Sequence, residues 1–335
     1  MASTSIFGFL FFSSLLLFSQ YFIVSSKGQG LPPIVKGLSW TFFDSSCPKL
    51  ESIVRKRLEK VFKDDIGQAA GLLRLHFHDC FVQGCDGSVM LDGSAGGPSE
   101  KTAIPNLTLR KESFKIIEDL RERVHKECGR IVSCSDIAAL AARDAVVLTG
   151  GPNYVVPLGR KDGLNFATEN ATLNNLVPPF ANTTTLLTSL ATKGFDPTDV
   201  VALSGAHTIG ISHCTSFTDR LYPNQDSTMD KAFANNLKRS CPKIDSNNTV
   251  NMDTRAFYVD QDLFTDRRTR GIVTSFGRDQ KVFFDKFVIA MIKMGQLNVL
   301  TRGQGEIRAK CSVRNKDKLL ADVVQGLEKT LSAAF

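Results

Sequence analysis

Residues 71–91, GLLRLHFHDCFVQGCDGSVML, hold the densest group of reactive side chains in the sequence. The run contains an arginine, two histidines, two aspartates and two cysteines within an otherwise apolar segment. Arg74 and His78 are four residues apart, so on a helix they project from the same face, one turn apart. A fixed cation beside a titratable imidazole indicates a catalytic pair, and we predict that this helix carries the active site.

The loop after this helix is rich in oxygen ligands. A hard cation such as calcium is bound by carboxylate, hydroxyl and backbone oxygens in a tight, glycine-containing loop. The alternative is a solvated acidic turn, and the spacing alone does not decide between the two. The ligands that the loop offers are Asp79, Val82, Gly84, Asp86 and Ser88.

Length and charge limit the classes of protein to consider. With 335 residues, the chain is long enough for two lobes or one large domain. Its net charge of +7 and isoelectric point near 9.0 suit an anionic matrix, a polysaccharide or a membrane surface. Basic and acidic residues are interspersed, so we expect no nucleic-acid partner.

The first 26 residues predict a secretory signal peptide. They form an apolar run that ends at Ser25 and Ser26, and serines and Gln20 interrupt the run too often for a membrane anchor. No other stretch approaches a membrane-spanning length, so no membrane association is expected. Sequons at Asn170, Asn182 and Asn247 are consistent with secretion and glycosylation.

Eight cysteines in a secreted chain indicate an oxidising compartment and four disulfides. Spacing alone leaves 105 pairings open. The sequence contains no CxxC pair, which argues against a zinc site.

Apolar residues recur at helical spacing through most of the chain, which predicts a mainly α protein. Residues 135–148 are apolar on all sides and should form a central buried helix. Asp196 and Pro197 are suited to begin a helix that ends near His207. Further helices are expected over 50–62, 69–78, 114–124, 233–237 and 282–294, with loops over 92–106 and 155–182.

Two of the five histidines lie in informative surroundings. His78 follows Arg74 by one turn, and His207 ends the segment VALSGAHTIG. A hydrolase would need a nucleophile, but Ser204 lacks the GxSxG pattern, and a zinc protease would need HExxH. Two different surroundings suit two roles better than one shared metal site.

These motifs resemble those of the plant secretory (class III) haem peroxidases. The resemblance extends from about Leu38 to Asn315 and includes all eight cysteines. The matching segments are RLHFHDCFVQGCDGSVML at 74–91, SCSDIAALAARDAV at 133–146, VPLGRKD at 156–162, VALSGAHTIG at 201–210 and YVDQDLF at 258–264.

The resemblance implies a two-lobed, mainly α haem peroxidase fold with haem b between a distal half, about 38–180, and a proximal half, about 181–315. The whole domain would cover residues 31–315. The implied disulfides are Cys47 with Cys128, Cys80 with Cys85, Cys134 with Cys311, and Cys214 with Cys241, and the implied buried ion pair is Asp136 with Arg160.

The resemblance also assigns catalytic roles. His207 would be the axial iron ligand, with Asp260 as its anionic partner. On the opposite face, His78 would be the general base and then the acid, with Arg74 stabilising negative charge. Asn106 would accept the His78 ring N–H and would therefore be buried rather than glycosylated.

The remaining implications concern calcium, substrates and location. Two calcium ions are expected, the distal one in the loop after His78, with Glu100 nearby. Hydrogen peroxide and small phenolic donors would be the substrates, with Val177 in the donor-binding stretch and anionic cell-wall polysaccharide as a further partner. A secreted monomer is expected, and the extension over 316–335 is either a docking segment or a sorting propeptide that would direct the chain to the vacuole.

One departure from the family pattern affects these expectations. Only six residues separate Asp253 from Asp260, where the family has a longer interval with further calcium ligands. Thr208 and Asp253 still match the proximal calcium site, which we predict to be weakened or lost. The alternative to an active enzyme is a protein that keeps the fold and binds haem or cell wall but is catalytically weak.

Overall fold

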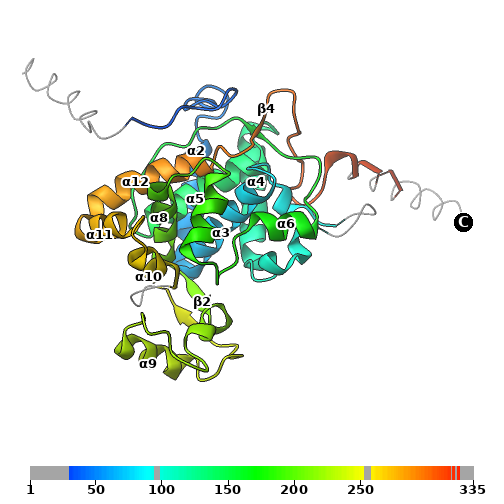
Figure 1. The fold of residues 1–335 in the computed structure, drawn as a ribbon. Helices are drawn as coiled ribbons and strands as arrows, with labels where there is room; N and C mark the ends of the chain where they lie inside the picture. The colour runs from blue at the N-terminus through cyan, green and yellow to red at the C-terminus, as the bar shows by residue number, and fades with distance from the viewer. Residues whose placement is uncertain (1–29, 94–98, 253–257, 318, 321–322, 325–335) are drawn as a thin grey trace, which may run out of the picture. The chain divides into compact units, whose positions relative to one another are not determined.

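A computed structural model of the chain describes residues 30–93, 99–252, 258–317, 319–320 and 323–324, with only the backbone of 258–261 (Figure 1). The predicted signal peptide lies outside these residues. The chain divides into two units, Met1–Pro32 and Pro33–Phe335, and the helices and strands named below belong to the second. In the described part of the chain, no helix combines the length and apolarity needed to cross a membrane.

The fold is mainly helical, as the sequence predicts. Short 3-10 helices, labelled η, and four short strands connect the α-helices. The elements are α2 (Leu50–Asp64), α3 (Gly67–Val82), η1 (Ser88–Met90), η2 (Glu100–Thr102), η3 (Ile104–Asn106), α4 (Lys111–Cys128), α5 (Cys134–Leu148), β1 (Arg160–Lys161), α6 (Glu169–Asn175), α7 (Thr183–Ala191), α8 (Pro197–Ser204), η4 (Gly205–Thr208), β2 (Ile211–His213), η5 (Cys214–Ser216), η6 (Thr218–Arg220), α9 (Lys231–Ser240), β3 (Thr249–Asn251), α10 (Tyr258–Thr265), α11 (Arg270–Arg278), α12 (Gln280–Met294) and β4 (Leu300–Thr301).

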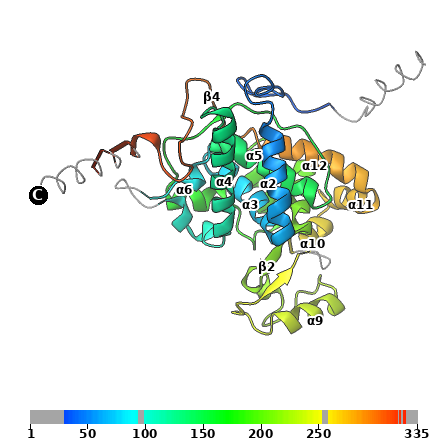
Figure 2. The same ribbon diagram turned by 180° about the vertical axis from the view of Figure 1, so that it is seen from behind.

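Two groups of helices pack around α5 and α8. Helices α2, α3 and α4 contact α5, which is buried from Cys134 to Val146, as its uniformly apolar sequence predicts (Figure 2). Helices α7, α10, α11 and α12 contact α8, and α12 also touches α3. A salt bridge of 2.6 Å between Lys293 and Asp199 joins α12 to α8. The site described below is formed by α3 and by η4, which follows α8.

A smaller cluster surrounds α9. Strands β2 and β3 pair antiparallel, with Ile211 opposite Asn251, and the disulfide between Cys214 and Cys241 lies in a separate apolar core (Figure 1). All four disulfides pair as the resemblance implies: Cys47–Cys128, Cys80–Cys85, Cys134–Cys311 and Cys214–Cys241. No free cysteine remains among the described residues.

The expected loop over 155–182 is wrong in two respects. It contains helix α6, where the Thr168 side chain accepts a hydrogen bond from Ala171 N and caps a turn too short to show a helical period. Strand β1, within the same stretch, pairs with the distant β4. The expected helix ending at His207 also differs: α8 ends at Ser204, and His207 lies on the tighter η4.

A fully buried ion pair connects the two helix groups. Arg160 Nη1 lies 2.8 Å from Asp136 Oδ1, and neither side chain is exposed to solvent. Asp136 also accepts hydrogen bonds from the backbone N–H groups of Gly159 and Arg160. Arg160 donates through Nε and Nη2 to Gly295 O at the end of α12, where a cation interacts favourably with the helix dipole. The pair therefore fixes the start of α5 against the end of α12.

We expect Asp136→Asn to lower the free energy of unfolding by about 3–5 kcal/mol, because it leaves a buried guanidinium without its counter-charge. The matched control is Glu127→Gln, which removes the acid of the exposed Lys49–Glu127 pair and should change little. Denaturant unfolding of both variants measures the difference. Equal effects would show that the buried pair does not hold the helix groups together.

Candidate active site

Helix α3 presents Arg74 and His78 on one face, as their spacing predicts. Arg74 Nε lies 3.2 Å from His78 Nε2 and points toward it as a donor. The imidazole is 4% exposed, and Phe77 packs its ring edge-to-face against it. The structure therefore places a permanent cation directly against the nitrogen that a catalytic base would use.

Asn106 determines the tautomer of His78. Its Nδ2 donates to the backbone oxygen of Glu100 at 2.8 Å, which fixes the orientation of the amide. Asn106 Oδ1 therefore faces His78 Nδ1 at 2.6 Å and accepts its N–H. With the proton on Nδ1, the lone pair of His78 lies on Nε2. Asn106 is 3% exposed, in keeping with an internal hydrogen-bonding role.

The segment that carries Asn106 also anchors Arg74. Arg74 Nη1 donates to Thr108 O at 2.9 Å, and Nη2 donates to Pro105 O at 3.1 Å and to Thr108 Oγ1 at 3.0 Å. Sequence reasoning missed Pro105 and Thr108, because backbone carbonyl oxygens exist at every position and leave no signal in residue type. One short segment thus positions both members of the predicted catalytic pair.

The charge of Arg74 acts on both His78 and His207. Burial, and then the charge of Arg74, lower the pKa of His78 to about 3, while Asn106 partly opposes the change. Burial and the same guanidinium lower the pKa of His207 to about 4. Arg74 therefore lies close enough to act on both imidazoles, and both are neutral at pH 7. The half-buried His207 is held by η4, where a Cβ on Gly205 would overlap the ring of Phe283.

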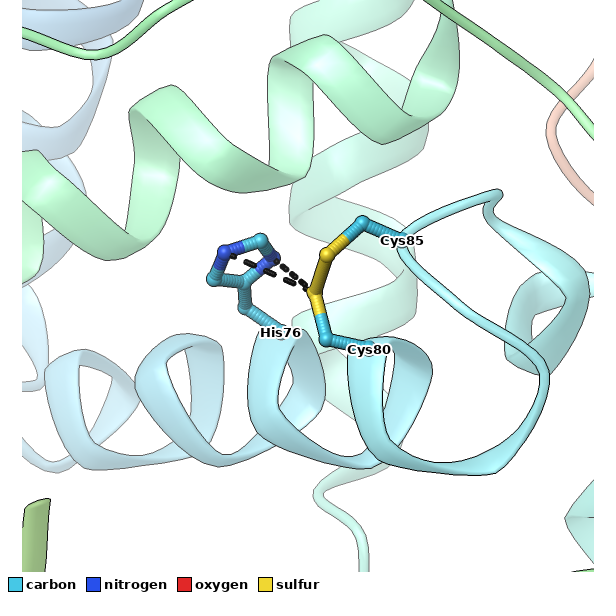
Figure 3. Close-up of side chains that lie close together, drawn as sticks. All are labelled: His76, Cys80 and Cys85. Carbon is cyan, nitrogen blue, oxygen red and sulfur yellow. Dashed lines mark hydrogen bonds between the residues drawn. A yellow bond between two sulfur atoms is a disulfide. The ribbon is translucent and has the colours of Figure 1, made fainter. Parts of the chain in front are cut away.

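His76 faces a different part of the core. Figure 3 shows its imidazole beside the Cys80–Cys85 disulfide, with Cys80 Sγ 3.6 Å from His76 Nδ1. Within the described part of the chain, these are the residues whose ligand atoms cluster most like a metal site. Both sulfur atoms are engaged in the disulfide and are not thiolates, so the group is not a zinc site. The rejection of zinc at this motif agrees with the geometry.

The loop after α3 gathers buried acidic side chains. Asp79 Oδ2 accepts from Gly87 N at 3.0 Å, whereas its Oδ1 is buried without a hydrogen-bond partner among the described residues. Burial and nearby carboxylates raise the pKa of Asp79, Asp86 and Glu100 above their usual values. Val82, Gly84 and Ser88 are buried in the same segment. An unpartnered buried carboxylate oxygen within an acidic cluster fits a bound cation better than a solvated turn.

Glu100 connects this acidic loop to the catalytic pair. Its side-chain Oε1 accepts from Ala167 N at 2.7 Å, while its backbone oxygen accepts from Asn106. Arg308, also missed by sequence reasoning, is fully buried and donates to Gly87 O and Gly163 O at 2.6 Å each. The charge of Arg308 lowers the pKa of Asp79 and Glu100, whereas burial raises it. Any cation held by the loop would therefore act on His78 through Glu100 and Asn106.

The structure describes the remaining predicted site residues only in part. Val177 is half-buried after α6, and Thr208 is exposed beside His207. Asp260 lies in α10, but its side chain is outside the described residues, and Asp253 is outside them altogether. The predictions for Asp260 as partner of His207, and for the proximal calcium, therefore remain predictions.

The donor set of the site suits a haem. A neutral imidazole is the form that binds iron, and His207 has its pKa far below 7. Helix α3 offers a second neutral imidazole and a guanidinium, and Phe77, Leu203 and Ala206 contribute partly buried apolar surface. The site therefore contains two neutral imidazoles, of which only His78 has a guanidinium as a direct hydrogen-bond partner.

Comparison with known proteins agrees with this geometry. A family model described as "Peroxidase" matches residues 54–291. The chain is 58% identical over 318 residues to Peroxidase 12 of Arabidopsis thaliana, covering 90% of this chain and 89% of the relative. It is 53% identical over 303 residues to cationic peroxidase SPC4 of Sorghum bicolor, covering 85% and 84%.

The chain belongs to the plant secretory (class III) haem peroxidases. It is a haem-dependent peroxidase with the mainly helical fold of that family. The comparisons do not favour the alternative of a catalytically weak binding protein, because these relatives are named as peroxidases and align along most of their length.

Proposed function

We propose that this peroxidase reduces hydrogen peroxide at a haem b held by His207 and oxidises small phenolic donors. Bound haem would supply the redox centre, which accepts two oxidising equivalents from peroxide and passes one to each of two donor molecules. The residues of the chain would bind the peroxide, move its proton and stabilise the charge that develops.

His78 Nε2 would take the proton from one peroxide oxygen and deliver it to the other. The hydrogen bond from Nδ1 to Asn106 leaves the lone pair on Nε2, and the low pKa keeps the imidazole neutral over the working pH range. A protonated His78 could not accept the proton, so the base is available only above its pKa of about 3.

Arg74 would stabilise the negative charge that develops on the leaving oxygen. Removing one such preorganised donor typically costs about 10²–10³-fold in rate. Its contacts with Pro105 and Thr108 hold the guanidinium in place before the reaction, so little reorganisation is needed. The single observation that carries the proposal is the hydrogen-bonded series from Glu100 O through Asn106 and His78 to Arg74.

We expect His78→Ala to slow the reaction with hydrogen peroxide by about 10²–10⁴-fold, because the proton then has no positioned acceptor. Stopped-flow mixing of the haem-loaded protein with peroxide measures the rate. The control His213→Ala changes an exposed histidine on β2 and should react like the parent. If both variants react alike, His78 is not the base.

Calcium binding at the loop after α3 is part of the proposal. Asp79, Asp86 and Ser88 would supply side-chain oxygens, and Val82 and Gly84 would supply backbone oxygens. The unpartnered Asp79 Oδ1 supports this assignment. The shortened interval before Asp260 supports the loss or weakening of the proximal ion at Thr208 and Asp253.

Metal analysis of the purified holoprotein should find one tightly held calcium per haem. Asp86→Asn should release it and lower the thermal midpoint, because a ligand that binds only the folded state stabilises that state. The control Asp245→Asn alters an exposed aspartate and should retain the ion. Two tightly held ions per haem would overturn the predicted weakening of the proximal site, and none would overturn the distal one.

The location of the enzyme is a further proposal. The apolar first 26 residues, the four disulfides and the sequons support secretion to the cell wall as a monomer. The extension over 316–335 would direct the chain to the vacuole if it acts as a sorting propeptide. The positive net charge supports anionic cell-wall polysaccharide as a partner.

A further inference from the structure

A small internal cavity lies beside the buried ion pair of Arg160 and Asp136. It has a volume of about 10 Å³ and is lined by apolar residues, by Gly295 at the end of α12, and by the polar side chains of His76, Tyr154 and Arg160. These three side chains are at most 9% exposed. They come from α3, from the segment between α5 and β1, and from β1. The cavity therefore lies where several separate elements meet.

The guanidinium of Arg160 has more donors than the protein has acceptors for it. An arginine carries five N–H groups. Four hydrogen bonds are made: Nε and Nη2 donate to Gly295 O, and Nη1 donates to Asp136 Oδ1 and to Pro157 O. These bonds leave one N–H of Nη2 without an acceptor among the described residues. A buried donor without an acceptor is unfavourable, so this N–H requires a further partner.

The other two polar side chains of the cavity also lack strong partners. The backbone oxygen of Tyr154 accepts from Arg143, but its hydroxyl has no partner within the part of the chain that the structure describes. The hydrogen-bond contacts of His76 among those residues are long ones to Cys80 Sγ, a weak acceptor (Figure 3). Burial, and then the charge of Arg160, lower the pKa of His76 to about 3, so one of its ring nitrogens is an acceptor at pH 7.

One position beside Gly295 is close to two of these groups. A methyl group built on Gly295 would lie 3.2 Å from Arg160 Nη2 and 3.6 Å from His76 Nε2. Tyr154 borders the same cavity. A buried water needs a volume of about 10–15 Å³ and two to four polar partners. The cavity meets both conditions.

We propose that this cavity binds one ordered water molecule that joins Tyr154, His76 and Arg160. The water would accept the free N–H of Arg160 Nη2 and the O–H of Tyr154, and it would donate to His76 Nε2. Three hydrogen bonds are typical of a buried water. Donation to Nε2 places the proton of His76 on Nδ1, the nitrogen that lies 3.6 Å from Cys80 Sγ. The water thereby connects α3 to the ion pair that fixes α5 against α12.

A crystal structure of the haem-loaded, full-length protein tests the proposal. We expect one water within about 3.2 Å of Tyr154 Oη, His76 Nε2 and Arg160 Nη2. Gly295→Ala should exclude this water, because its methyl group takes the same space, and the φ of −63° at Gly295 suits alanine. The control Gly277→Ala adds a methyl group that meets no atom within 4 Å and should retain the water.

Denaturant unfolding of Tyr154→Phe in two backgrounds provides a second measurement. In the parent, loss of the hydroxyl should raise the unfolding equilibrium constant about fivefold, the effect of one hydrogen bond. In the Gly295→Ala protein the same substitution should have little effect, because the water is already excluded. The double-mutant cycle therefore isolates the coupling between Tyr154 and the position beside Gly295.

Three outcomes would overturn the inference. The first is a parent crystal structure without water at this position. The second is a water that remains in Gly295→Ala. The third is an equal effect of Tyr154→Phe in both backgrounds, which would mean that the hydroxyl does not act through the water. Neither measurement depends on turnover, so failure of this inference is distinguishable from failure of the proposed catalytic function.

Discussion

The hydrogen bond between Asn106 and His78 is the contact on which the distal half of the site depends. An amide can face either way, and only one orientation places Oδ1 toward His78 Nδ1. The backbone oxygen of Glu100 selects that orientation by accepting from Asn106 Nδ2. The tautomer of His78 is therefore set by a backbone atom of Glu100, two hydrogen bonds away from the imidazole. The same residue carries a carboxyl group into the proposed calcium loop.

Burial imposes a second constraint, because it keeps His78 and His207 neutral. In the proposed function one imidazole ligates metal and the other accepts a proton, and protonation would prevent either. Arg74 reinforces this, since its charge acts on both rings. The same burial is unfavourable for the acidic loop, where it raises the pKa of Asp79 and Asp86, and a bound cation would offset that effect. Burial thus favours neutral imidazoles at His78 and His207 and a cation site in the loop after α3.

The features that could be predicted from the sequence are those that depend on the type and spacing of side chains. The one-turn spacing of Arg74 and His78, the apolar helix over 135–148 and the Asp196–Pro197 helix start were all recognisable, and the family resemblance implied the four disulfides. Contacts made by backbone atoms were not recognisable: Pro105 and Thr108 hold Arg74 through carbonyl oxygens. Helix α6 was missed because seven residues rich in asparagine show no helical period, and its cap, Thr168, resembles an ordinary loop residue.

The central claim is that His207 holds the haem while His78 faces it without ligating the iron. Haem titration of the parent, His207→Ala and His78→Ala proteins, followed by the Soret absorption, tests this claim most directly. We expect His78→Ala to bind haem like the parent, whereas His207→Ala should bind weakly and recover on addition of imidazole. Unchanged haem binding by His207→Ala, together with its loss in His78→Ala, would contradict the assignment of the two histidines.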